Sequence, residues 1–193
     1  MLGLTFKDDL SWKSHITSLA KSASQKLGIL FRFRNYFTNK QLLTLYVGTI
    51  RPCMEYCCHI WGRYPGVDLL DKVQSKAFRL ISSSTLTDSL PSLSLRCDVA
   101  SLSLYYRYYF GRCSVELQSC IPPPLNRPRA TRQASQAHQY AVALSQSRIE
   151  RFSKSFIPST SVLWNDLPSE VFPETYDLTK FKSNINKYFR SIP

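Results

Sequence analysis

Residues 12–31 read WKSHITSLAKSASQKLGILF, and the apolar side chains in this stretch recur every three or four residues. That spacing brings them to one side of a helix with 3.6 residues per turn. The apolar face consists of Trp12, Ile16, Leu19, Ala20, Ala23, Leu27, Leu30 and Phe31. Lys13, Lys21 and Lys26 lie off that face. The stretch therefore predicts a long amphipathic helix that has one basic side.

Three more helices are predicted before residue 121. Thr38-Asn-Lys-Gln41 has the pattern of a capping box, in which each end residue accepts a backbone N–H of the helix start. This second helix should be kinked or interrupted at Pro52, which lacks an N–H and crowds the preceding turn. Apolar spacing predicts a third helix at about 67–81 and a fourth at about 90–110. The fold class is therefore mainly α, a helical array of about four long helices.

Composition changes after the fourth helix. Residues 1–121 form the predicted helical domain, and residues 122–148 are rich in Pro, Arg, Gln, Ser and Ala, as a partly disordered linker is. Residues 149–193 regain an apolar pattern and predict a small C-terminal segment. Within it, residues 151–158 are expected to be extended and residues 177–188 to form a final helix.

Positive charge is in excess and unevenly distributed. The 193 residues contain 25 Lys and Arg against 13 Asp and Glu, for a net charge of +12. Most of the excess lies in residues 1–51 and 122–158. A charge of this size favours a polyanionic partner, nucleic acid first and an acidic membrane surface second. A basic surface that is merely solvated is the alternative.

The chain shows no signal peptide and no apolar run long enough for a membrane helix. We therefore expect an intracellular protein, in the nucleus or the cytoplasm, whose six cysteines are reduced.

Asp8 and Asp9 raise the question of a polymerase active site, because such enzymes hold two metal ions between converging carboxylates. In a polymerase the pair sits at a hairpin tip and is joined by a carboxylate from far upstream. Here no acidic residue precedes Asp8, and a helical pattern follows at once. The pair, together with Ser11, is better explained as the start of the first helix. No catalytic residue is assigned.

Cys53, Cys57, Cys58 and His59 suggest zinc, but the spacing of the other cysteines supplies no regular second pair of ligands. Buried thiols are the expected outcome. No glycine-rich phosphate loop is present, so no cofactor and no metal site are assigned.

The basic residues are the best candidates for function. Lys and Arg on one face displace counterions from phosphates and give binding that depends on salt but not on sequence. The candidate nucleic-acid-binding residues are Lys13, Lys21, Lys26, Arg32, Arg34, Lys40, Arg51, Arg129 and Arg132. The aromatic run at 105–110 can stack bases, although half or more of it must be core.

Several motifs stand in an order known from one family. They are Leu2-Gly-Leu-Thr-Phe6, Leu10-Ser-Trp-Lys-Ser-His-Ile16, Arg51-Pro-Cys-Met-Glu-Tyr56 with Trp61, Asp71-Lys-Val-Gln-Ser-Lys-Ala77 with Arg79 and Ile81, Ser155-Phe-Ile-Pro158, and Leu163-Trp-Asn-Asp-Leu-Pro168. In this order they resemble the region after the palm in reverse transcriptases of LINE-type, jockey-like non-LTR retrotransposons. The resemblance covers nearly the whole chain. Ser159 and Val162 depart from it, since the family commonly carries arginines there.

The resemblance implies the thumb and C-terminal part of an RNA-directed DNA polymerase, a region that grips the template–primer duplex. The catalytic aspartates and the Mg²⁺ of the intact enzyme belong to the palm, so this chain is expected to be inactive alone. Expected partners are RNA or DNA and a palm and fingers region encoded elsewhere. A structural or interaction protein, or a transposon relic without a nucleic-acid role, is the alternative function.

Overall fold

The computed structural model describes residues 3–5, 7–8, 11–125 and 138–191. Across these residues the protein is mainly α-helical, which confirms the predicted fold class, and their β pairing is limited to one bridge between Pro124 and Val142. None of the helices described is both long and apolar enough to cross a membrane. Contacts divide the chain into two compact units, Met1–Arg96 and Cys97–Pro193. The division therefore falls after Arg96 and not at the expected residue 121.

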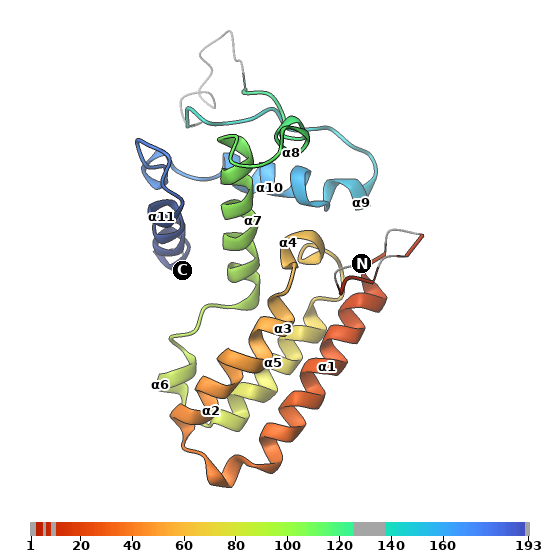
Figure 1. The fold of residues 1–193 in the computed structure, drawn as a ribbon, viewed down its shortest axis with the longest axis vertical. Helices are drawn as coiled ribbons and strands as arrows, with labels where there is room; N and C mark the ends of the chain where they lie inside the picture. Colours follow the sequence, from red (N-terminus) through yellow and green to blue (C-terminus); the bar gives the residue numbers. More distant parts are fainter. Residues whose placement is uncertain (1–2, 6, 9–10, 126–137, 192–193) are drawn as a thin grey trace. The chain divides into compact units, whose positions relative to one another are not determined.

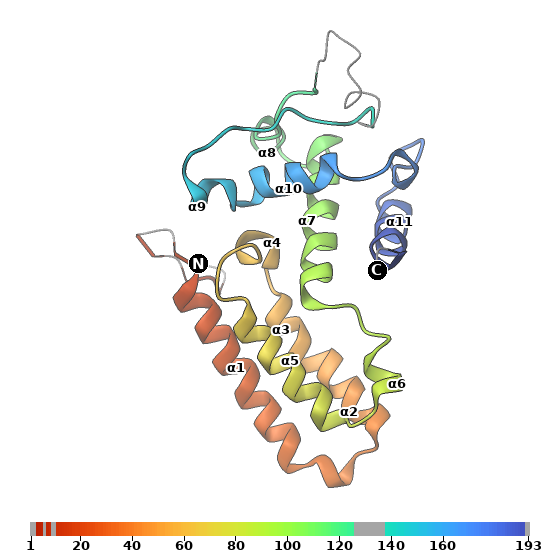
Figure 2. The ribbon, with the colours of Figure 1, turned by 180° about the vertical axis from the view of Figure 1, so that it is seen from behind.

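The first unit is built on three helical rods. Helix α1 and the segment α2–η2–α3 run in opposite directions, and α5 lies alongside α1 (Figures 1 and 2). The elements are α1 (Lys13–Arg32), η1 (Arg34–Tyr36), α2 (Asn39–Leu45), η2 (Tyr46–Ile50), α3 (Arg51–Glu55), α4 (Cys58–Trp61), α5 (Asp68–Ile81) and α6 (Ser84–Thr87).

The predicted apolar face of α1 forms one wall of the first core. Ile16, Ala23, Leu27 and Leu30 are buried there, as expected from their spacing. The facing buried residues are Leu42, Tyr46, Ile50 and Met54 of the second rod, and Leu70, Val73, Ala77 and Ile81 of α5. Phe31 differs from the expectation, because 53% of its surface is exposed. The stripe therefore leaves the core at its C-terminal end and continues onto the surface.

The second rod begins with the predicted capping box. The Gln41 N–H donates to Thr38 Oγ1 at 3.4 Å, and the Thr38 N–H donates to Gln41 Oε1 at 2.8 Å. Pro52 neither ends nor interrupts this rod, since α3 continues through it. Instead the preceding residues form a π-helical turn, η2, closed by the Arg51 N–H bonding to the Tyr46 carbonyl. The wider turn covers the residues that the proline ring would otherwise crowd.

Arg51 is the centre of a buried ion pair. Only 3% of it is exposed, and its Nε donates to Glu55 Oε1 at 2.8 Å. Its Nη2 donates to the Pro91 carbonyl. Arg96 adds a second cation, with its Nη2 2.6 Å from Glu55 Oε2. Glu55 therefore connects α3 to the first turn of the helix that begins at Leu93.

Replacing Glu55 by glutamine is expected to destabilise the protein by about 2 kcal/mol, because a buried guanidinium then lacks its counter-charge. Equilibrium urea denaturation followed by circular dichroism measures this. Asp68→Asn is the matched control. In the Lys72–Asp68 ion pair on α5 both side chains are exposed to solvent, so the pair contributes little to the free energy of unfolding. Equal effects of the two substitutions would contradict the assignment.

The second unit collects helices from widely separated parts of the chain around α7. Helix α10 passes across α7, and α11 lies beside it (Figures 1 and 2). The elements are α7 (Leu93–Tyr109), whose first residues belong to the first unit, α8 (Val115–Ser119), α9 (Glu150–Ser153), α10 (Phe156–Asn165), η4 (Ser169–Val171) and α11 (Leu178–Ser191).

Trp164 lies at the centre of this second core and is fully buried. Its ring centroid is 5.1 Å from that of Tyr105 and 4.9 Å from that of Phe172, and its Nε1 donates to the Tyr140 carbonyl at 2.8 Å. Tyr106 stacks on Phe181 with centroids 4.2 Å apart. Aromatic pairs in such offset and edge arrangements add to the free energy of burial. The core of the second unit is therefore stabilised mainly by packing between aromatic side chains.

One prediction for this region is wrong. Residues 151–153 are helical in α9 and residues 156–158 form the first turn of α10, where Pro158 removes an N–H that has no partner in that turn anyway. Of the expected linker, 122–148, residues 126–137 lie outside the described part of the chain, but Ala141 and Val142 are buried in the core, and the Leu125 N–H bonds to the Ala141 carbonyl at 2.8 Å. The predicted final helix is confirmed as α11.

His138 carries a pH dependence into this core. Its Nε2 is 2.7 Å from the Trp164 carbonyl, and its Nδ1 accepts the Tyr140 N–H at 3.2 Å, so the neutral ring with a proton on Nε2 satisfies both contacts. Burial lowers the His138 pKa below 6.5, and the Trp164 carbonyl opposes this in part.

Because the His138 pKa is lower in the folded chain than in the unfolded chain, the unfolded chain binds a proton at pH values just below 6.5 at which folded His138 stays neutral. Stability is therefore full above pH 6.5 and falls as the pH drops below it. We expect the urea midpoint to fall between about pH 7.5 and about pH 5.5, and to fall less in a His138→Gln variant. Part of the dependence should persist there, because burial also lowers the pKa of His15 and His59. An unchanged pH profile in that variant would contradict the role of His138.

Candidate nucleic-acid interface

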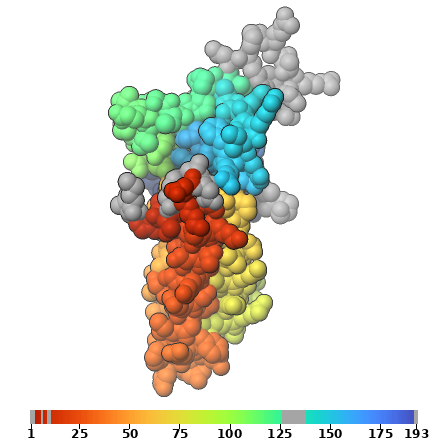
Figure 3. All heavy atoms as spheres, turned by 90° about the vertical axis from the view of Figure 1, so that its right-hand side faces the viewer, coloured from red at the N-terminus to blue at the C-terminus, as the bar shows by residue number. Residues whose placement is uncertain are grey.

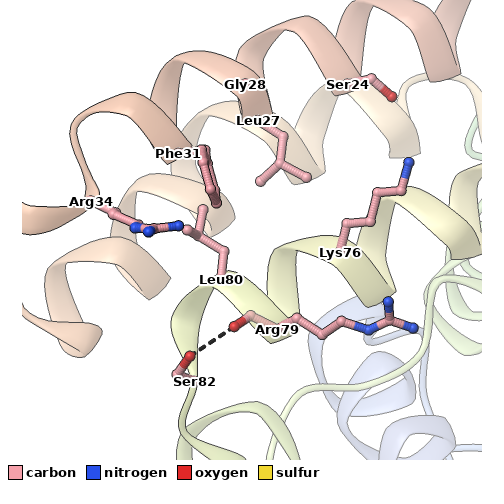
Figure 4. A pocket seen from close by; sticks show the side chains of 9 residues that line it. All are labelled: Ser24, Leu27, Gly28, Phe31, Arg34, Lys76, Arg79, Leu80 and Ser82. Carbon is pink, nitrogen blue, oxygen red and sulfur yellow. Dashed lines mark hydrogen bonds between the residues drawn. The ribbon is translucent and has the colours of Figure 1, made fainter.

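A groove of about 480 Å³ lies between α1 and α5 in the first unit (Figure 4). Its apolar part comes from both helices, and three cations border it. The lining residues are Ser24, Leu27, Gly28 and Phe31 of α1, Arg34 of η1, Lys76, Arg79 and Leu80 of α5, and Ser82. In the space-filling view the surface of α1 lies directly beside that of α5 (Figure 3).

Helical spacing places these side chains together. Ser24, Leu27, Gly28 and Phe31 are separated by three, one and three residues and so form one stripe of α1. Lys76, Arg79 and Leu80 form the matching stripe of α5. Figure 4 shows Leu27 and Phe31 projecting from α1 toward α5, and Lys76 projecting from α5 toward α1.

Gly28 keeps the α1 side of the groove open. A Cβ atom at this position would meet no other atom within 4 Å, so the glycine is not required by close packing. At the other edge Ser82 ends α5 in the left-handed conformation, with φ of 52°, and its hydroxyl donates to the Arg79 carbonyl at 2.8 Å. The groove is thus bounded on one side by the face of α1 at Gly28 and on the other by the C-terminal end of α5 at Ser82.

The groove carries three cations and no anion. Among the residues that the structure describes, no ion pair involves Arg34, Lys76 or Arg79. The Arg34 guanidinium instead lies over the Phe31 ring, 4.1 Å from its centroid (Figure 4). All three cations are exposed to solvent. A ligand with several negative charges close together therefore finds uncompensated positive charge and an aromatic face in one place.

Of the predicted site residues that the structure describes, Arg34 alone lines the groove. Lys13, Lys21, Arg32 and Lys40 are exposed elsewhere on α1, at its C-terminus and on α2.

Four predicted positions differ from the expected basic surface or cannot be placed. Arg51 is a correction: it is buried in its ion pair with Glu55 and cannot reach a phosphate. Lys26 is exposed, but its Nζ donates to Cys53 Sγ at 2.6 Å and so is directed toward α3. Arg129 and Arg132 lie outside the described residues.

Lys76 and Arg79 were not predicted as site residues. Lys72, Lys76 and Arg79 recur at helical spacing on the polar side of α5, which was the available signal. Arg79 belongs to one of the motifs that resemble the reverse transcriptase family, but to no predicted site. Their place in the lining of the groove depends on how α1 packs on α5, which spacing within one helix does not reveal.

The described residues do not fit a magnesium site. Asp8 is exposed, Asp9 lies outside the described part of the chain, and both oxygens of Glu55 are engaged by arginines. No group of three metal-ligating side chains occurs among the residues described. The N-cap of α1 is Trp12, which has no capping side-chain bond, and Ser11, one position earlier, accepts the Lys13 N–H through its Oγ at 3.4 Å.

The aromatic run at 105–110 belongs mainly to the core. Tyr105 and Tyr106 are fully buried, and burial raises the pKa of the Tyr105 hydroxyl to about 12 while its bond to Ser161 opposes this. These rings are unavailable for stacking bases. The six cysteines are free thiols, of which Cys58 and Cys97 are buried.

Comparison of the chain with protein-family models, with curated proteins and with solved structures gave no match.

Proposed function

We propose that this chain is a nucleic-acid-binding segment of an RNA-directed DNA polymerase of the LINE type, and that it contributes contacts to the template and primer but no catalytic group. The observation that carries the proposal is the groove between α1 and α5, which Arg34, Lys76 and Arg79 line and where none of the three has a carboxylate partner among the described residues. The ordered sequence motifs support the proposed enzyme class, and the cations of the groove support contact with phosphate.

The charge distribution supports a phosphate backbone as ligand. Exposed Lys13 and Lys21 extend the positive surface along α1 beyond the groove. Phosphates spaced along a strand are matched by cations spaced along a helix, and each phosphate neutralised releases counterions. Such binding is largely independent of sequence, as a region that holds any template requires.

The test is a binding titration of the whole chain with a labelled RNA–DNA hybrid over a series of salt concentrations. We expect the logarithm of the affinity to fall linearly with the logarithm of the salt concentration, with a slope of about −3 or steeper, because three groove cations and further α1 lysines contact phosphates. An affinity that does not change with salt would contradict the proposal. Primer extension in the presence of Mg²⁺ is expected to give no product, and DNA synthesis would refute the non-catalytic part.

An interaction protein is the second candidate function, favoured by the exposed aromatic residues at the turn between α1 and α2. Phe33, Tyr36 and Phe37 are 52%, 81% and 38% exposed. Neutralising Lys13, Lys21, Lys26 and Arg34 together separates the two functions. Only nucleic-acid binding predicts that the variant loses its retention on a polyanion column.

A further inference from the structure

The groove offers more than phosphate contacts. Leu27, Phe31 and Leu80 give it an apolar lining, which a phosphate backbone does not use. A double helix presents its charged backbone outward and keeps the faces of its bases stacked inside. An apolar groove that is rimmed by cations suits a ligand with a flat apolar part between negative charges.

We infer that the groove binds an unpaired nucleobase of single-stranded nucleic acid, with the flanking phosphates on Arg34, Lys76 and Arg79. This inference rests on the proposed function and specifies its ligand as a single strand. Phe31 and Arg34, whose guanidinium carbon lies 4.1 Å from the ring centroid, supply the two kinds of surface on which unpaired bases stack, an aromatic ring and a guanidinium plane.

The size of the groove agrees with one nucleotide. Its volume of about 480 Å³ lies within the range of pockets that hold small organic ligands. The open space at Gly28 adjoins the stripe that contains Leu27 and Phe31, so a flat ring can approach the α1 backbone closely. Phe31 is 53% exposed although it continues an otherwise buried stripe, so its ring has a free surface for a ligand to cover.

The experiment measures fluorescence anisotropy of the whole chain with two labelled strands about 12 nucleotides long, within the usual site size of single-strand binders. One strand is all thymidine, and the other carries the same phosphates and sugars without bases. We expect the thymidine strand to bind about 10-fold more tightly, the value of one stacked base. Equal affinity for the two strands overturns the inference.

Two substitutions locate the base. Phe31→Ala should remove most of the difference by weakening only the thymidine strand, again about 10-fold. Its matched control is Phe33→Ala, because Phe33 is 52% exposed but does not line the groove. Gly28→Leu should fill the groove and have the same selective effect. Gly28→Ala adds only a methyl group, and Gly48→Leu adds the same side chain outside the groove, so neither should have this effect. In all three variants the new Cβ lies in open space, so the folds should be preserved alike.

The outcomes separate the inference from the proposed function. Salt-dependent binding of both strands with equal affinity, or an equal loss on both strands in Phe31→Ala, contradicts the base site and leaves phosphate binding intact. No salt-dependent binding of either strand contradicts both. Selective loss in Phe31→Ala with an unchanged circular dichroism spectrum confirms the base site even where Gly28→Leu fails to fold.

Discussion

Replacing Arg34, Lys76 and Arg79 together by glutamine is expected to weaken binding to an RNA–DNA hybrid roughly 100-fold at low salt. Each replacement removes a charge-assisted contact to phosphate worth about 1 kcal/mol or more, and 1.4 kcal/mol corresponds to a factor of ten. The slope of log affinity against log salt should become shallower by about 2–3, because three fewer counterions are released. The measurement is an anisotropy titration at several salt concentrations.

The control for this experiment keeps the net charge equal. Lys180, Lys182 and Lys187 are exposed on α11 and outside the groove, and their replacement by glutamine removes the same total charge. Affinity should then change only slightly, through the weaker long-range field. If both triple variants lose affinity equally, net charge and not the groove determines binding, and the assignment of the interface is wrong.

Replacing Trp164 by alanine is expected to destabilise the second unit by about 3–5 kcal/mol, the usual cost of deleting a large ring from a core. The Tyr140 carbonyl also loses the donor that Trp164 Nε1 supplies. Urea denaturation measured by tryptophan fluorescence and circular dichroism gives the free energy of unfolding.

Val162→Ala on the same helix is the control for Trp164→Ala, because Val162 is 47% exposed and should change stability by no more than about 0.5 kcal/mol. A loss below about 1 kcal/mol in Trp164→Ala would contradict the central position of this ring.

Elements with strong local patterns could be predicted from the sequence. The stripe of α1, the box at Thr38 and Gln41, and the apolar spacing of α5 depend only on neighbours within one or two turns. In these cases local preference and tertiary packing agree.

Elements that depend on distant contacts could not be predicted. Nothing near Pro52 indicates that a π turn will absorb it, and the residues around His138 have the composition of a linker although His138 bonds to the Trp164 carbonyl. Pro158 is compatible with an extended strand as well as with a first helical turn, and packing favours the helix.

The candidate site could be predicted only in part, because some of its residues depend on local sequence and others on contacts between distant helices. The basic side of α1 follows from spacing, and Arg34 was predicted as one of the basic residues along the first two helices. Lys76 and Arg79 become part of a site only when α5 lies against α1, and Arg51 leaves it only because a carboxylate one turn away holds it inside.

The partners of α7 come very late in the chain. Tyr106 accepts a hydrogen bond from the Asp177 N–H, 71 residues further on, and stacks on Phe181. On the ribosome α7 therefore emerges long before the rings that will cover it. Until synthesis has passed Phe181 and Ile185, the nascent chain exposes the aromatic side chains of α7, which are prone to aggregation. We therefore expect truncation before Phe181 to destabilise the second unit more than the first, and we expect contacts of such long sequence separation to slow its folding.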